Sequence, residues 1–386
     1  MTYGQYFLLG STDFNSFYFK IIMLMCGILT LILKRHLVPK GIFVAWSLLV
    51  LSILLTTAYN VIFLYRDLNQ LFVGINSYMS LALLAPLAFL FRSSSYVKYL
   101  INFIAIISVP IAIFGILQYI NNQTYLPELK INDRNFINSI WFFDRIRAVS
   151  LFNSGLDFGV FLLFSLSIII SNNSIFRGVI KLVALIILIT AIYMTLTRNV
   201  YIGLFLSLAT FVVTFIPYRL KSKIMLLIPS LFIAFSLMIL FLPQGAESGV
   251  ANANSLDARL EIWRESFQRL NMLGLPGILF GSGEVQSYTL ESTSATIIDN
   301  YPLALIFFGG AASLVTFYSY LLSLWSYVVK NMKFSRLSNA VLIAVSAIFG
   351  MQMFNIIAVM PFVCFILLFL DHGEENENHP YPQRIS

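Results

Sequence analysis

The sequence predicts an all-α, polytopic integral membrane protein with about 11 (10–12) transmembrane helices. Three observations support this fold class. Of 386 residues, 59% are hydrophobic and only 11% are charged, which would leave a soluble domain covered in apolar surface. Apolar runs of about 20 residues, the length that crosses a hydrocarbon core, recur along the chain. Basic residues gather in every second loop between these runs.

The apolar runs define the spans in order. Lys34 and Arg35 follow the first run where a signal peptide would have a small-residue cleavage site, so this helix is expected to stay in the membrane. That span either stands alone or belongs to a longer segment, 6–33, and the last two spans are either separate or one helix kinked at Pro361. The predicted spans are 17–33, 41–64, 71–91, 98–120, 155–171, 178–195, 199–216, 223–242, 301–329, 337–356 and 357–370.

The loop charges predict the orientation of the chain, because short loops rich in Lys and Arg stay in the cytoplasm. None of the five basic loops contains an Asp or Glu, so these loops are assigned to the cytoplasm and the N-terminus to the outside. Their basic residues are Lys34, Arg35 and Lys40; Arg92 and Lys98; Arg177 and Lys181; Arg219, Lys221 and Lys223; and Lys330, Lys333 and Arg336.

Acidic residues mark the opposite side. Outside the acidic tail, 371–386, which is predicted to be cytoplasmic, every Asp and Glu falls in or beside an external segment. Two external loops are long, 121–154 and 243–300, and residues 1–386 form one membrane domain. The working surface is therefore expected to be external.

Composition also excludes several classes of function. The net charge of +7 is mostly the signature of basic cytoplasmic loops. The sequence has no basic stripe interleaved with aromatic residues, so it does not predict a nucleic-acid partner. Cys26 and Cys364 fall inside apolar runs and are interpreted as small buried hydrophobes. We therefore expect neither a disulfide framework nor a Cys-based metal site, and no feature of the sequence predicts a cofactor.

The larger external loop contains a predicted amphipathic helix near 255–270. Ser255 caps it, and Arg259 and Arg264 lie on its first turns. A glycine-rich turn, 273–283, is expected to end it. The helix either lies on the bilayer with solvated arginines or presents them to a ligand. Its apolar residues recur at helical spacing, at Leu260, Trp263, Phe267 and Leu270.

Three further arginines lie at the external side. Arg145 and Arg147 immediately precede the fifth span, and Arg198 lies between two apolar runs with hardly any loop around it. Arg198 either anchors a helix end by snorkelling or has a functional role that offsets the cost of a cation at the membrane surface. Arginines on separate segments would suit the phosphate or diphosphate of a lipid carrier, because guanidinium binds phosphate bidentately.

Asp299 and Asn300 stand just outside the ninth span. The pair either caps that helix or supplies a carboxylate that accepts a proton from an attacking sugar hydroxyl. Both roles can coexist.

Four segments together resemble the bacterial O-antigen ligase and polymerase superfamily, membrane glycosyltransferases that act on undecaprenyl-diphosphate-linked glycans. Their order and spacing agree over roughly residues 140 to 330. The segments are "RAVSLFNSGLDFG" at 147–159, "TLTRNVYIG" at 195–203, "ARLEIWRESF" at 258–267 and "DNYPLALIFFGG" at 299–310.

The resemblance implies a GT-C-like fold and metal-independent transfer. It assigns the lipid diphosphate to Arg198 and Arg259, and to Arg147 less directly. In ligases, the position that matches Asp299 looks like a functionally essential His. None of the three histidines of this chain lies on the predicted external side. The carboxylate therefore favours the polymerase branch, with Asp299 as general base.

The predicted function is a Wzy-type polymerase at the periplasmic face of the bacterial inner membrane, with lipid-linked glycans as donor and acceptor and membrane lipid around it. Asn300 and Tyr301 would shape the site, Arg145 and Arg264 would assist in binding, and Trp263 either stacks on a sugar or anchors its helix. A chain-length regulator is left open as a partner. One rival is a ligase that transfers finished glycan to lipid A core or protein.

A rival of another class is a transporter or flippase for the lipid-linked unit. Transport is disfavoured because the sequence shows no mid-span cluster of ionisable residues and no pair of broken half-helices.

Overall fold

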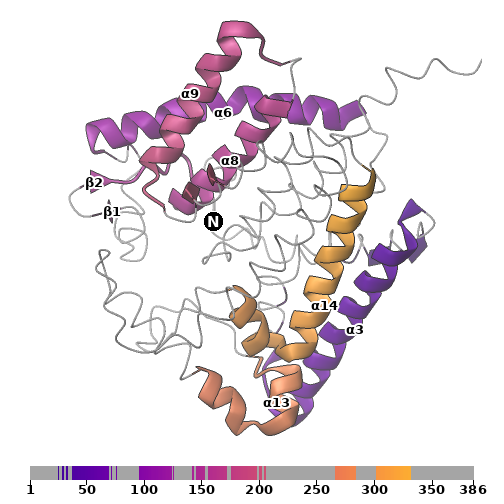
Figure 1. Cartoon of the computed structure of the whole chain (residues 1–386). Helices are drawn as coiled ribbons and strands as arrows, with labels where there is room; N and C mark the ends of the chain where they lie inside the picture. Colours follow the sequence, from indigo (N-terminus) through magenta and orange to yellow (C-terminus); the bar gives the residue numbers. More distant parts are fainter. Residues whose placement is uncertain are drawn as a thin grey trace, which may run out of the picture.

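In the residues that the computed structural model describes, the chain is mostly helical, with one two-stranded ribbon (Figure 1). Its helices are α3 (Lys40–Phe63), α6 (Ser95–Asn121), α8 (Gly155–Ser171), α9 (Gly178–Met194), α13 (Gly274–Phe280) and α14 (Tyr301–Asn331), and its strands are β1 (Trp141–Phe142) and β2 (Arg145–Ile146). The described residues are 25, 28–29, 32–33, 37–68, 71, 75, 95–123, 125, 141–142, 145–152, 155–171, 175–197, 200–201, 204–205, 266–283 and 301–331.

Five predicted spans coincide with described helices to within three residues at each end. The pairs are 41–64 with α3, 98–120 with α6, 155–171 with α8, 178–195 with α9 and 301–329 with α14. Within the described residues, three helical stretches are long and apolar enough to cross a membrane, Lys40–Phe63, Asn102–Asn121 and Pro302–Tyr320. The other predicted spans fall wholly or mostly outside the described residues, so the total of about eleven stays a prediction.

Helices α3 and α14 run side by side in opposite directions (Figure 1). The Ser52 and Thr316 hydroxyls are 2.9 Å apart, and one turn further along α3 the Thr56 hydroxyl donates to the Gly309 carbonyl at 3.3 Å. Small hydroxyl residues at the contact let the two backbones approach closely and bond across it. The antiparallel arrangement agrees with the directions that the loop charges predict for these two spans.

Helix α14 is broken at Gly310, where φ is 68° and ψ is −174°. The sequence does not indicate this break, because Gly310 lies inside an apolar run. Residues 281–283 fill the break: the Ser282 and Gly283 N–H groups donate to the Phe307 and Phe308 carbonyls at 2.8 and 3.1 Å. The break leaves these two carbonyls without N–H partners in the helix, and residues 282 and 283 supply N–H groups in their place.

The expected glycine-rich turn, 273–283, contains a helix. The chain turns at Leu273 and continues as α13 before reaching Gly281. Pro276 lies in the first turn of α13, where its missing N–H has no helical acceptor to lose. Of the amphipathic helix predicted near 255–270, the described part, 266–270, is helical.

Helices α6, α8 and α9 pack together as a second group (Figure 1). Near the end of α8 the Ile170 carbonyl accepts a hydrogen bond from Lys181 Nζ of α9 at 3.0 Å. At the opposite end, Gly155 of α8 lies against the Thr195 carbonyl that follows α9. The two helices are therefore antiparallel, and the start of α8 meets the end of α9 on the predicted external side.

Candidate functional site

The chain after β2 crosses the end of the α6, α8 and α9 group. β2 pairs with β1 in antiparallel register, with Trp141 opposite Ile146. The Ile146 side chain is buried, and its N–H donates to Asn122 Oδ1 at 2.8 Å. The alternation of exposed Arg145 and buried Ile146 fixes which way each side chain points.

Gln118, one turn before the end of α6, holds the following segment in place. Its buried amide accepts from the Ser150 N–H at 2.7 Å and from the Val149 N–H at 3.3 Å, and donates to the Ser150 carbonyl at 3.1 Å. Ser150 has a left-handed backbone (φ 51°), and its hydroxyl donates to the Ile111 carbonyl at 2.8 Å. The path of residues 147–150 is therefore determined by α6.

Gln118→Leu should destabilise the protein by roughly 2–4 kcal/mol, because each buried polar group left without a partner costs about 1–3 kcal/mol. Thermal unfolding in detergent micelles, followed by size exclusion, measures the effect. Leu117→Ala on the exposed side of the same turn is the matched control and should change stability little. Equal stability of the two variants would contradict the structural role assigned to this amide.

Two of the four segments that carry the family resemblance, 147–159 and 195–203, contact each other. The Ala148 N–H donates to the Met194 carbonyl at 2.9 Å. A Cβ on Gly155 would stand 2.8 Å from the Thr195 carbonyl oxygen, and one on Gly159 would stand 2.4 Å from Val200. Both glycines therefore permit an approach that any side chain would prevent.

Arg145 and Arg147 lie among tyrosines at this end of the bundle. The Arg145 guanidinium lies over the Tyr119 ring at 5.7 Å from its centroid, a cation–π geometry. Arg147 is half-buried and lies near enough to Tyr201 for the two groups to interact electrostatically. We call Tyr119, Arg145, Arg147, Tyr193 and Tyr201 the rim cluster.

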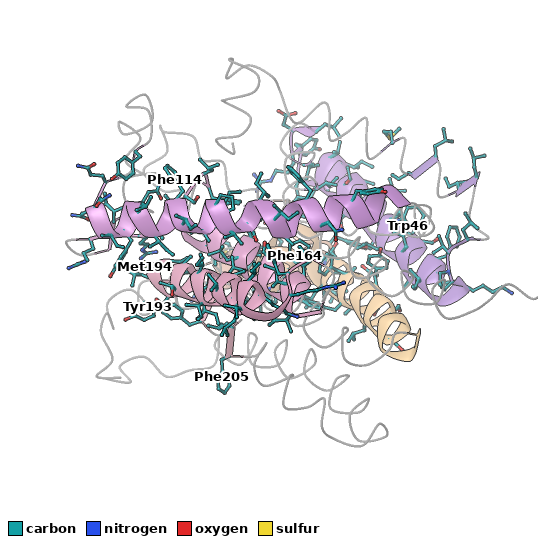
Figure 2. All side chains as sticks on the ribbon, turned by 90° about the horizontal axis from the view of Figure 1, so that it is seen from above. Trp46, Phe114, Phe164, Tyr193, Met194 and Phe205 are labelled. Atoms are coloured by element: carbon teal, nitrogen blue, oxygen red, sulfur yellow. The ribbon has the colours of Figure 1, made fainter. Side chains whose placement is uncertain are left out.

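Tyr193 and Tyr201 complete the rim cluster. Their rings stack at 6.2 Å, and the Tyr201 hydroxyl donates to the Tyr193 carbonyl at 2.5 Å. Figure 2 shows Tyr193 and Met194 at the end of α9. They lie beside the part of α6 that contains Phe114. Sequence reasoning missed all three tyrosines, although tyrosines at the ends of spans are a known signal of the membrane interface.

The rim cluster offers two guanidinium groups and the exposed Tyr193 ring, with 65% of that residue accessible. Arginine binds phosphate oxygens bidentately, and aromatic rings with a polar end suit a surface that is partly apolar and partly wet. The arrangement is therefore suited to an anionic, amphipathic molecule. Among the described residues, no three His, Cys, Asp or Glu side chains gather where they could hold a metal ion.

The remaining predicted site residues divide into two sets. Tyr301 begins α14, which packs on α3 and α13. The others lie outside the described residues, so their convergence with the rim cluster stays a prediction; they are Arg198, Arg259, Trp263, Arg264, Asp299 and Asn300.

No family model, curated protein or solved structure matches this chain. The family resemblance therefore depends on the four quoted segments alone.

Proposed function

We propose that the chain is a membrane glycosyltransferase that joins undecaprenyl-diphosphate-linked repeat units into a long surface polysaccharide at the periplasmic face of the bacterial inner membrane. A hydroxyl of the acceptor repeat unit attacks the anomeric carbon of the donor glycan. The new glycosidic bond forms as the bond to the diphosphate oxygen breaks, and undecaprenyl diphosphate leaves with the electron pair. The proton of the attacking hydroxyl passes to Asp299.

The arginines act on the leaving group. Arg198 and Arg259 stabilise the charge that develops on the diphosphate, where fixed cations contribute most to the rate. Arg145 and Arg147 bind the same anionic region, and Asn300 and Tyr301 shape the acceptor side. No step in this scheme uses a metal or a cofactor.

The observation that supports the proposal best is the contact between segments 147–159 and 195–203. The Ala148–Met194 hydrogen bond and the close approach of Gly155 to Thr195 bring the residue after Arg147 to the end of α9, four positions before Arg198 in the sequence. A site that binds a diphosphate needs several cations converging from separate segments. Ala148 and Met194 are 46 positions apart in the sequence, and they meet at one end of the helix group.

The broken helix α14 bears on the alternative function, transport of the lipid-linked unit. Broken helices in transporters leave backbone groups open to the substrate. Here the Phe307 and Phe308 carbonyls accept hydrogen bonds from the Ser282 and Gly283 N–H groups. The Gly309 carbonyl accepts one from the Thr56 hydroxyl. The break therefore serves packing within the chain, and it does not favour transport over transfer.

Deletion of the gene tests the proposal. Loss of a polymerase should leave single lipid-linked repeat units on the periplasmic side and no long polysaccharide, and the full chain should restore long polysaccharide. Gel electrophoresis of the glycans measures chain length, and a membrane-impermeant glycosidase reports their side. Long lipid-linked chains left unattached would indicate a ligase, and units confined to the cytoplasmic side would indicate a transporter. Either result would overturn the polymerase assignment.

A further inference from the structure

The segment 266–283 changes character at Met272. Before it, the exposed residues are Phe267 and three polar ones, Gln268, Arg269 and Asn271, as expected of a helix with one face in water. From Met272 to the end of α13, every exposed residue is apolar, with 83% of Met272 and 69% of Leu275 accessible. Residues 272–283 contain no charged residue at all.

The far end of this segment is anchored inside the helix pair of α3 and α14 (Figure 1). The Phe280 ring packs on Tyr59 of α3 at 5.5 Å, and the Phe280 carbonyl accepts a hydrogen bond from Asn60 Nδ2 at 3.4 Å. Ser282 then donates through its N–H and its hydroxyl to the Phe307 carbonyl of α14, at 2.8 and 3.0 Å.

These anchors lie within two candidate spans. Tyr59 precedes the last residue of α3, Phe63, by four positions, which is about 6 Å along a helix axis. Phe307 follows the first residue of α14 by six positions, or about 9 Å. If α3 and α14 cross a bilayer, the end of α13 lies below the membrane surface.

The surface beside α13 has the same character. Ile62 and Phe63, in the last turn of α3, are exposed and apolar, as lipid-facing residues of a span are. Tyr59 of α3, which packs on Phe280, also packs on Phe63 at 5.6 Å, so the end of α13 lies beside this apolar last turn of α3. At the end of α13 the Gly277 carbonyl accepts from the Gly281 N–H and the Phe280 carbonyl accepts from Asn60, so these backbone groups already have partners away from water.

We propose that residues 272–283 form a re-entrant segment that enters the outer leaflet and binds acyl chains through Met272, Leu275 and Leu279. The segment enters at the boundary between Asn271 and Met272, and it ends in the break of α14. The predicted external loop 243–300 is then divided into two parts by a stretch in contact with lipid. This inference depends on α3 and α14 crossing a bilayer and is independent of the reaction proposed above.

A spin label at position 275 tests the proposal. Cys26 and Cys364 are replaced by Ala, and Leu275→Cys is labelled with a nitroxide and the full chain is reconstituted into phospholipid vesicles. Electron paramagnetic resonance compares collisions of the label with oxygen, which concentrates in hydrocarbon, and with a water-soluble nickel complex. Gln268→Cys is the matched control for water, and Leu54→Cys, on the exposed side of α3, is the control for lipid.

The ratio of oxygen to nickel collisions at position 275 should clearly exceed that at position 268 and lie between it and the ratio at position 54, which is nine residues from the end of α3 and therefore deeper. A ratio equal to that at position 268 would place α13 in water and overturn the proposal. Weak collisions with both reagents would show that protein covers this face, either another segment of this chain or a second copy, and would overturn it as well. Vesicles lacking negatively charged lipid should give the same ratio, because acyl chains are the partner.

Discussion

Asp299→Asn should reduce polymer formation by about 10²–10⁴-fold, the usual contribution of a general base. The substitution separates the two roles that the sequence leaves open for this carboxylate. Asn caps helices as well as Asp does, so the start of α14 at Tyr301 should be unaffected. Asn has no basic oxygen to accept the hydroxyl proton, so only the chemical role is lost. Polysaccharide chain length in a deletion strain carrying the variant measures the effect, at protein levels matched by immunoblot.

The matched control is Asp67→Asn. Asp67 also precedes a helical segment on the predicted external side, since the Leu71 N–H donates to the Asp67 carbonyl at 3.2 Å. This variant should make polysaccharide of normal length, because no catalytic role is assigned to Asp67. Normal chains from Asp299→Asn would exclude Asp299 as the base. Short chains from both variants would point to a general effect of charge at this surface.

Five of the six described helices were predictable to within three residues because each is a long apolar run between polar ends. The α9 run, 178–195, begins after Arg177 and ends at a turn, and nothing inside it competes with helix formation. The relative directions of α3 and α14 were also predictable, because they follow from the count of spans and the basic loops. Periodicity and charge are local signals, and they are sufficient for features that depend on one segment.

The break in α14 was missed because it depends on two segments. Gly309 and Gly310 lie inside an apolar run that reads as an unbroken span. The Phe307 and Phe308 carbonyls accept no hydrogen bond within the helix at this point. They accept from the Ser282 and Gly283 N–H groups instead, which belong to a segment distant in sequence. Sequence periodicity carries no information on such a contact between segments.

The candidate site was predictable in part. The charges place Arg145 and Arg147 at the external side, and the structure brings both to the same end of the helix group. The tyrosines around them were missed because a Tyr at a helix end has an ordinary explanation as an interface anchor. Which way Tyr119 and Tyr193 face depends on the rotation of α6 and α9 about their axes, which packing determines.

Gly310→Ala should prevent folding or destabilise the protein by on the order of 4 kcal/mol or more, the range reserved for disrupted cores and strained backbone. A Cβ at this position would stand 2.2 Å from the Leu279 carbonyl oxygen and 2.4 Å from the Phe280 nitrogen. These are backbone atoms, so no side-chain rotation relieves the overlap. The backbone conformation of Gly310 (φ 68°, ψ −174°) lies in a region almost restricted to glycine and adds a further cost of about 1–3 kcal/mol for any residue with a Cβ.

Two other Gly→Ala variants separate these causes. Gly178 also has a positive φ, 55°, but a Cβ there meets nothing within 4 Å, so Gly178→Ala should lose only about 1–2 kcal/mol. Gly41, in the first turn of α3, has neither strain nor a close neighbour, and Gly41→Ala should be neutral or slightly stabilising. Thermal unfolding in detergent should rank the three variants as Gly41, Gly178 and Gly310 in order of falling stability. If Gly310→Ala unfolds at the same temperature as Gly178→Ala, the backbone of residues 279–283 does not pack into the break of α14. The proposed anchor of the re-entrant segment would then be absent.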